Sequence, residues 1–150
     1  MDWDFAFKAA NMFALLAWVV LILLPRRPAL LSAVLYFGVG ILCLAYTTAF
    51  GLILSGLVSA GEGGAGANFH TIEGVRDFFA SDGGVTIGWI HYLAFDLFVG
   101  LWIARDADSK SISRFIQAPI LMFTLFVGPV GLFIWLIIRE PAAKRQGRWN

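Results

Sequence analysis

The sequence GWIHYLAFDLFVGLWI at residues 88–103 decides the fold, because a stretch of this length with no charge other than Asp96 is typical of a membrane-spanning helix. An ionised carboxylate at bilayer depth costs at least about 2.5 kcal/mol even on the most favourable insertion scale. A sequence seldom keeps one without a partner or a function, so Asp96 is a candidate functional residue. The alternative is a buried aspartate that hydrogen-bonds neighbouring helices and only fixes their packing.

The composition supports a membrane protein. Of the 150 residues, 59% are hydrophobic and 14% are charged, whereas a charged share of about 25% is usual. A span needs roughly 20 predominantly apolar residues, and the long uncharged runs predict four transmembrane helices at about residues 5–24, 30–58, 86–104 and 116–138. The expected fold class is an all-α, polytopic membrane protein in which residues 1–150 form a single membrane-embedded domain.

The connection between the second and third spans has a pattern of its own. Apolar residues recur at helical spacing across residues 69–80, with polar residues on the other side, and the sequence SDGG at 81–84 ends the pattern. We expect a short amphipathic helix at the membrane interface. The glycine-rich linker at residues 61–67 would let it fold over the mouth of the bundle. The alternative is a solvated surface turn.

The distribution of charge predicts the orientation. Basic residues mark cytoplasmic loops, which places residues 25–28 and 105–114 inside and the acidic connection at 61–84 outside. Four full spans would then put the C-terminal tail outside, although residues 139–148 are the most basic part of the chain. The conflict disappears if the sequence GPVG at 128–131 breaks the last helix into a re-entrant hairpin, as Pro and Gly do where protein or water satisfies the freed backbone groups.

Several chemistries find no support in the sequence. Two histidines, with no cysteine or carboxylate cluster at ligand spacing, predict neither a metal site nor a haem. No phosphate-binding loop or nucleophile motif is present, so we expect no cofactor. The basic tail is short and close to a span, which favours lipid headgroups over nucleic acid.

The remaining polar residues lie at different depths. Asp96 is eight residues, about 12 Å, from the end of its span, while His91 is near the opposite end. His91 would suit a site near the outer mouth, within reach of Glu73 or His70. Hydroxyl groups on other spans that could hydrogen-bond Asp96 are those of Tyr46, Thr47, Thr48 and Thr124.

Four segments carry a resemblance to a known family. They are residues 69–79 with EGVR, residues 88–100, RDA at 105–107, and residues 119–131 ending in FVGPVG. Together they resemble the small four-helix membrane family of the plant neoxanthin synthase, the abscisic-acid-deficient type. The likeness covers most of the chain after Asn68, and the first 60 residues match only as two hydrophobic spans. The family implies a carotenoid-linked role, since its plant member is required to convert the epoxide violaxanthin into the allenic neoxanthin.

The chemistry that the resemblance implies is acid/base isomerisation without a metal or nicotinamide. An acid protonates the epoxide oxygen and a base removes a vinylic proton, with no net redox change. Asp96 or His91 could act as the acid, and Glu73 or His91 as the base. An apolar slot for a polyene would be lined by Trp89, Tyr92, Phe95, Phe98 and Trp102, and the other predicted substrate contacts are Thr124 and Arg76.

Two other classes of function stay open. A non-catalytic subunit would bind a carotenoid or lipid and form a homo-oligomer or join a larger pigment or biosynthetic complex, using helix faces with Gly38, Gly40, Gly51 and Gly56. A proton-coupled transporter would use Asp96 as its titrating group.

The sequence shows no plastid-targeting extension and related short chains occur in bacteria, so the expected location is a bacterial inner membrane.

Overall fold

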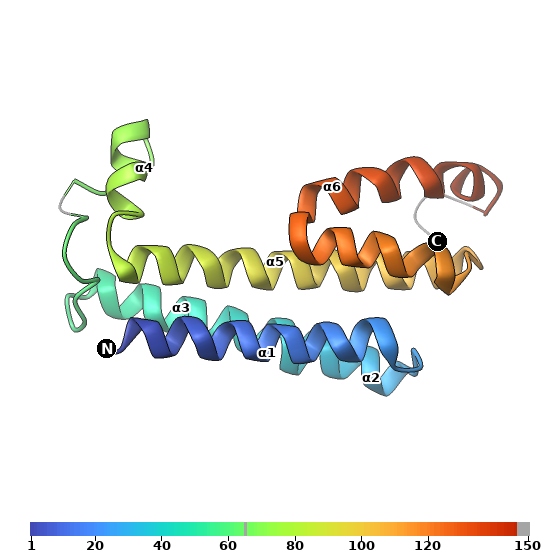
Figure 1. Cartoon of the computed structure of the whole chain (residues 1–150), viewed down its shortest axis with the longest axis horizontal. Helices are drawn as coiled ribbons and strands as arrows, with labels where there is room; N and C mark the ends of the chain where they lie inside the picture. The colour runs from blue at the N-terminus through green and yellow to red at the C-terminus, as the bar shows by residue number, and fades with distance from the viewer. Residues whose placement is uncertain (65, 147–150) are drawn as a thin grey trace. The chain divides into compact units, whose positions relative to one another are not determined.

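The computed structural model describes residues 1–64 and 66–146, and the basic-tail residue Arg148 lies outside that part. Its helices are α1 (Trp3–Leu23), α2 (Pro28–Ala33), a π-helical segment (Val34–Val39), α3 (Gly40–Leu54), α4 (Ile72–Phe78), α5 (Asp82–Ser109) and α6 (Arg114–Gln146) (Figure 1). The described residues contain no strand, which confirms the all-α class.

Four helical stretches are long and apolar enough to cross a membrane. They are α1, the continuous stretch Pro28–Leu54, α5, and Arg114–Arg145 of α6, which agree in length and composition with the four predicted spans. The predicted boundaries need correction. The second span ends at Leu54 rather than residue 58, because Gly56 turns the chain with φ of 73°. The third begins at Asp82, where the Ser81 hydroxyl accepts the Gly84 N–H at 3.1 Å, and it continues to Ser109.

The chain divides into two compact units. Unit 1 consists of Met1–Ala14 and Gly40–Ala94, and unit 2 of Leu15–Val39 and the chain from Phe95 onward. In unit 1, Trp3 is buried, its indole N–H donates to the Ser59 carbonyl at 3.1 Å, and its own carbonyl accepts from the Thr86 hydroxyl at 3.5 Å. The start of α1 is thereby tied to α5 and to the connection after α3. That residues 1–150 form a single domain stays a prediction.

Helix α4 forms within the segment expected to be an amphipathic helix at 69–80, but it is shorter, and its position at the membrane interface stays a prediction. It begins at Ile72, where the Thr71 hydroxyl accepts the Gly74 N–H at 3.0 Å. The Asn68 side chain accepts the N–H groups of His70 and Thr71 at 3.1 and 3.2 Å, which holds those residues in a turn instead of a helix. Figure 1 shows α4 beside the start of α5.

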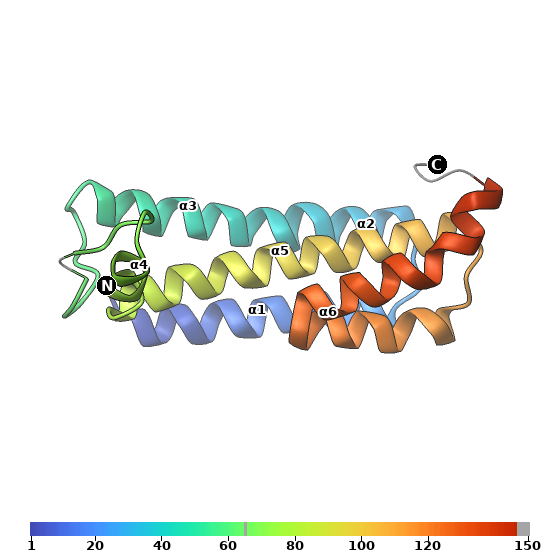
Figure 2. The same cartoon turned by 90° about the horizontal axis from the view of Figure 1, so that it is seen from above.

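Helix α6 is broken at Val127, whose φ of −145° and ψ of 61° are not helical. A Cβ atom added to Gly131 would lie 2.7 Å from the Cα of Thr124, whereas seven residues of straight helix span about 10.5 Å. The arms before and after Val127 therefore fold back on one another (Figures 1 and 2). Pro129, which has no N–H, lies two residues after the break. This geometry agrees with the hairpin alternative that the sequence left open.

Asp106 connects α5 to the returning arm of α6. Its carboxylate accepts from the Arg139 guanidinium at 2.6 and 2.9 Å, from Lys110 at 2.9 Å and from the Trp135 indole at 3.1 Å. Arg139 also lies over the Trp102 ring, 5.5 Å from its centroid. The side chains of Asp106, Arg139 and Lys110 are almost completely buried. This network fastens the second arm against α5.

Candidate functional site

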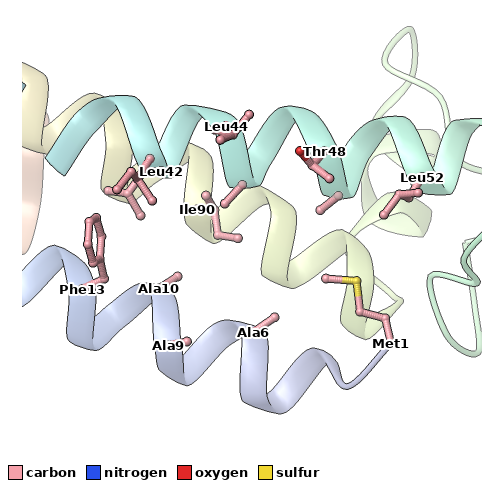
Figure 3. Close-up of a pocket in the computed structure, with 13 residues that line it drawn as sticks. Met1, Ala6, Ala9, Ala10, Phe13, Leu42, Leu44, Thr48, Leu52 and Ile90 are labelled. Carbon is pink, nitrogen blue, oxygen red and sulfur yellow. The ribbon is translucent and has the colours of Figure 1, made fainter. Parts of the chain in front are cut away.

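Unit 1 contains an apolar pocket of about 510 Å³ between α1 and α3, with Ile90 of α5 behind them (Figure 3). Its volume is within the range of roughly 300–1,000 Å³ that is usual for small-molecule sites. The lining residues are Met1, Ala6, Ala9, Ala10, Phe13, Ile41, Leu42, Leu44, Ala45, Thr48, Ala49, Leu52 and Ile90. Only Thr48 among them has a polar side chain, so the pocket favours an apolar ligand.

Alanine side chains make this pocket. Ala6, Ala9 and Ala10 lie on one face of α1 because residues three and four apart share a helix face, and Ala45 and Ala49 do the same on α3. Longer side chains at these positions would fill the space between the two helices. The local sequence thus produces the cavity within two helices that are apolar enough to span a membrane.

His91 is exposed on α5, next to Ile90 in the sequence. Its ring packs against that of Tyr46 with centroids 5.5 Å apart and a tilt of 57°, and Tyr46 stacks on Phe50 at 5.7 Å. An imidazole can donate or accept a proton in acid/base chemistry. His91 therefore lies one residue from the pocket lining and beside a phenol.

Two of the predicted aromatic contacts, Trp89 and Tyr92, form a separate cluster. The Trp89 and Tyr92 rings stack at 5.0 Å, Phe7 lies 5.8 Å from Trp89, and the Trp89 indole donates to the Asn11 side chain at 2.9 Å. Glu73 and Arg76 are exposed on α4. The pocket lining includes none of the residues that the sequence proposed as substrate contacts or catalytic groups in this unit.

The candidate residues of unit 2 lie at the break in α6. Asp96 is buried, with 9% of its surface exposed, and its Cγ would lie 2.5 Å from a Cβ atom added to Gly128. Thr124 is completely buried, and its hydroxyl donates to the Ile120 carbonyl at 2.9 Å. Phe95 is exposed. The buried carboxylate lies against Gly128, the first residue after the break.

Comparison with protein families confirms the resemblance found in the sequence. A family model described as ABA DEFICIENT 4-like matches residues 5–135. The chain belongs to the ABA DEFICIENT 4-like family. Comparison with curated proteins and with solved structures found no match.

All candidate residues of this ABA DEFICIENT 4-like protein, from Glu73 to Thr124, lie within the matched segment. Within the described part of the chain, no group of three or more His, Cys, Asp or Glu side chains is arranged to hold a metal ion. Sequence reasoning missed the alanine pocket and the Asp106–Arg139 pair. The repeat of alanine at positions 6, 9 and 10 was the one available signal for the pocket.

Proposed function

We propose that this ABA DEFICIENT 4-like protein binds a carotenoid or a similar polyene lipid in the apolar pocket of unit 1. The observation that carries the proposal is a cavity of about 510 Å³ with one polar side chain in its lining, set between two membrane-spanning helices. Family membership supports a polyene ligand, because the neoxanthin synthase resemblance implies a carotenoid-linked role.

The physical basis is van der Waals packing of an apolar ligand against an apolar lining, because a ligand that comes from the lipid phase is already out of water. A polyene gains little from polar contacts, so a lining of alanine, leucine and isoleucine is suitable, and Thr48 supplies one hydroxyl to orient an oxygen-bearing end group. A ligand could reach the pocket directly from the lipid phase, because Leu44 and Met1 in its lining are exposed.

Ala45→Phe should remove bound pigment. Ala45 lines the pocket and is exposed, so the larger ring can occupy the cavity without overpacking a buried core. We expect at least about a tenfold loss of affinity, equivalent to about 1.4 kcal/mol. The measurement is pigment per chain after purification from carotenoid-producing membranes, by lipid extraction and chromatography.

Cys43→Phe is the matched control, since Cys43 is exposed on the same helix and is absent from the pocket lining. It should retain pigment at the wild-type level. Equal pigment content in the two variants would place the ligand elsewhere and count against the pocket.

A second candidate function is acid/base isomerisation of the bound polyene epoxide. The ring contact of His91 with the Tyr46 phenol, one residue along α5 from the pocket-lining Ile90, favours it. Asp96 or His91 stays the predicted acid and Glu73 or His91 the predicted base, and none of the three lines the pocket. In this reaction the epoxide oxygen gains a proton, a vinylic carbon loses one, and no oxidant is consumed.

His91→Ala and Asp96→Asn should each abolish pigment conversion while the protein stays inserted and folded. Asn keeps the shape of Asp but loses the titratable proton, so Asp96→Asn separates proton chemistry from packing. The measurement is conversion of an epoxy-carotenoid, followed by chromatography, together with the melting temperature. Normal conversion by a folded Asp96→Asn variant would make Asp96 a structural residue.

Pigment that is bound but never converted would support the alternative, a non-catalytic subunit. Of the glycines proposed for assembly, Gly38 already packs inside unit 2, where an added Cβ would lie 3.1 Å from Leu97 and 3.2 Å from Ala17. Gly51 has no atoms within 4 Å of such a Cβ and is the better candidate for contact with a second chain. The family match does not support the expected bacterial inner membrane, and that location stays a prediction.

A further inference from the structure

Basic side chains gather in unit 2, whereas unit 1 holds most of the acidic ones. The basic residues of unit 2 are Arg26, Arg27, Arg105, Lys110, Arg114, Arg139, Lys144 and Arg145. Residues of this type at the ends of membrane helices attract the headgroups of acidic lipids. Which of these cations are available to a ligand depends on their partners within the unit.

The acidic groups at the ends of these helices are engaged inside the unit. The Asp106 carboxylate is taken by Arg139 and Lys110, which are themselves buried. The Asp108 carboxylate accepts from the Arg26 guanidinium at 3.0 Å and from the Gln117 amide at 3.1 Å. The Asp106 pairs are buried, whereas the Asp108 side chain that pairs with Arg26 is 39% exposed.

Arg26 also keeps its charge. Burial lowers the pKa of its guanidinium and Asp108 raises it in part, but the ordinary value is so high that the group stays protonated. Its side chain donates to the Gln117 amide oxygen and, at 3.0 Å, to the Ala104 carbonyl. These contacts hold the turn at residues 25–28 against the last turns of α5.

The remaining cations point outward. Among the described residues, Arg27, Arg105 and Arg145 are exposed and make no ion pair with another side chain. Arg114 is exposed and donates to the carbonyls of Ile22 and Leu24 at 3.2 and 2.8 Å. Phe115, beside it, is 92% exposed, as expected for an aromatic side chain that inserts at a membrane interface.

The fold-back of α6 brings its basic end to this surface. The Asp106–Arg139 ion pair places the second arm beside the end of α5, and Arg145 lies six residues, about 9 Å, farther along that arm. Figure 1 shows the α1–α2 turn, the α5–α6 connection and the end of α6 at one end of unit 2. We define the basic face as Arg27, Arg105, Arg114, Lys144 and Arg145, of which Lys144 also approaches the Glu140 carboxylate at 4.0 Å.

We propose that the basic face is a docking surface for the headgroups of anionic phospholipids in the leaflet next to it. The partner follows from charge complementarity, because Arg27, Arg105 and Arg145 are exposed without an ion pair to any described residue, while Asp106 and Asp108 pair with other cations of the unit. Arg114 and Phe115 would sit at the level of the headgroups, where a guanidinium binds phosphate and a ring enters the acyl boundary.

The test is lipid retention by the full chain in nanodiscs of phosphatidylglycerol and phosphatidylcholine, read by native mass spectrometry. Wild type should retain phosphatidylglycerol preferentially. The double variant Arg27→Gln/Arg105→Gln should lose about fivefold in this preference for each cation removed, which corresponds to about 1 kcal/mol apiece. The doubly conservative Arg27→Lys/Arg105→Lys chain keeps the charge and should keep the preference.

Lys8→Gln is the control, because Lys8 is a cation of unit 1 that pairs with Asp4. It should leave the lipid preference unchanged. Equal retention of the two lipids by wild type would overturn the proposal. So would an undiminished preference in the folded Arg27→Gln/Arg105→Gln variant, which would direct attention to an acidic protein as the partner.

Discussion

Cysteines at positions 109 and 145, introduced as Ser109→Cys and Arg145→Cys in a Cys43→Ser background, should react with a membrane-impermeant thiol reagent from the same side of the membrane. Both positions are exposed. The arm of α6 before Val127 covers residues 114–126, about 20 Å of helix, which is too short for a hydrocarbon core of about 30 Å. The second arm then returns, so α6 enters and leaves on one side. We expect each of these cysteines to react fully from one side of the membrane and not at all from the other.

Glu62→Cys supplies the comparison, since Glu62 is exposed in the acidic connection before α5. Helix α5 has 28 residues, about 42 Å, which is enough to cross the bilayer once. We therefore expect Glu62→Cys to react from the opposite side. If Arg145→Cys reacted together with Glu62→Cys and apart from Ser109→Cys, α6 would be a complete span and the hairpin would not persist in the membrane.

Asp106→Ala should lower the free energy of unfolding more than any other single substitution proposed for this protein. It leaves the Arg139 guanidinium and the Lys110 ammonium buried without their carboxylate. Breaking a buried ion pair in this way usually costs about 3–5 kcal/mol. The measurement is the free energy of unfolding in mixed detergent micelles, followed by circular dichroism across the transition.

Glu140→Ala is the matched control on α6. Glu140 approaches the exposed Lys144 at 4.0 Å, a geometry whose loss changes stability by no more than about 1 kcal/mol. Asp106→Asn should fall between the two, because the amide keeps an acceptor oxygen but no charge. Similar losses for Asp106→Ala and Glu140→Ala would show that the network does not fasten the second arm.

Much of the fold follows from hydrophobic runs, and the errors have identifiable causes. The third span was expected to end at residue 104, because charges follow Ala104, yet α5 continues to Ser109. The charged residues after Ala104 stay in the helix because the Asp106 carboxylate pairs with Arg139, which lies 33 residues away in the sequence. No local pattern reveals such a pair. The hairpin in α6 was only an alternative, because the sequence GPVG permits either a kink or a return.

The candidate site was only partly predictable for a related reason. The cost of a stranded carboxylate correctly indicated that Asp96 faces the protein interior. Its neighbour at the bend, Gly128, depends on a fold-back that helical periodicity does not encode. The pocket was missed because alanines carry no chemistry, and the space they leave appears only when α1 and α3 are packed together.

Pigment analysis of the wild-type chain tests the central claim most directly. The chain is purified from carotenoid-producing membranes in mild detergent, its lipids are extracted, and polyene per chain is measured by chromatography and by absorption with induced circular dichroism. The account predicts close to one polyene per folded chain, held in a chiral site that gives an induced signal. A folded chain that carries only membrane phospholipid, with no polyene and no induced signal, would contradict it.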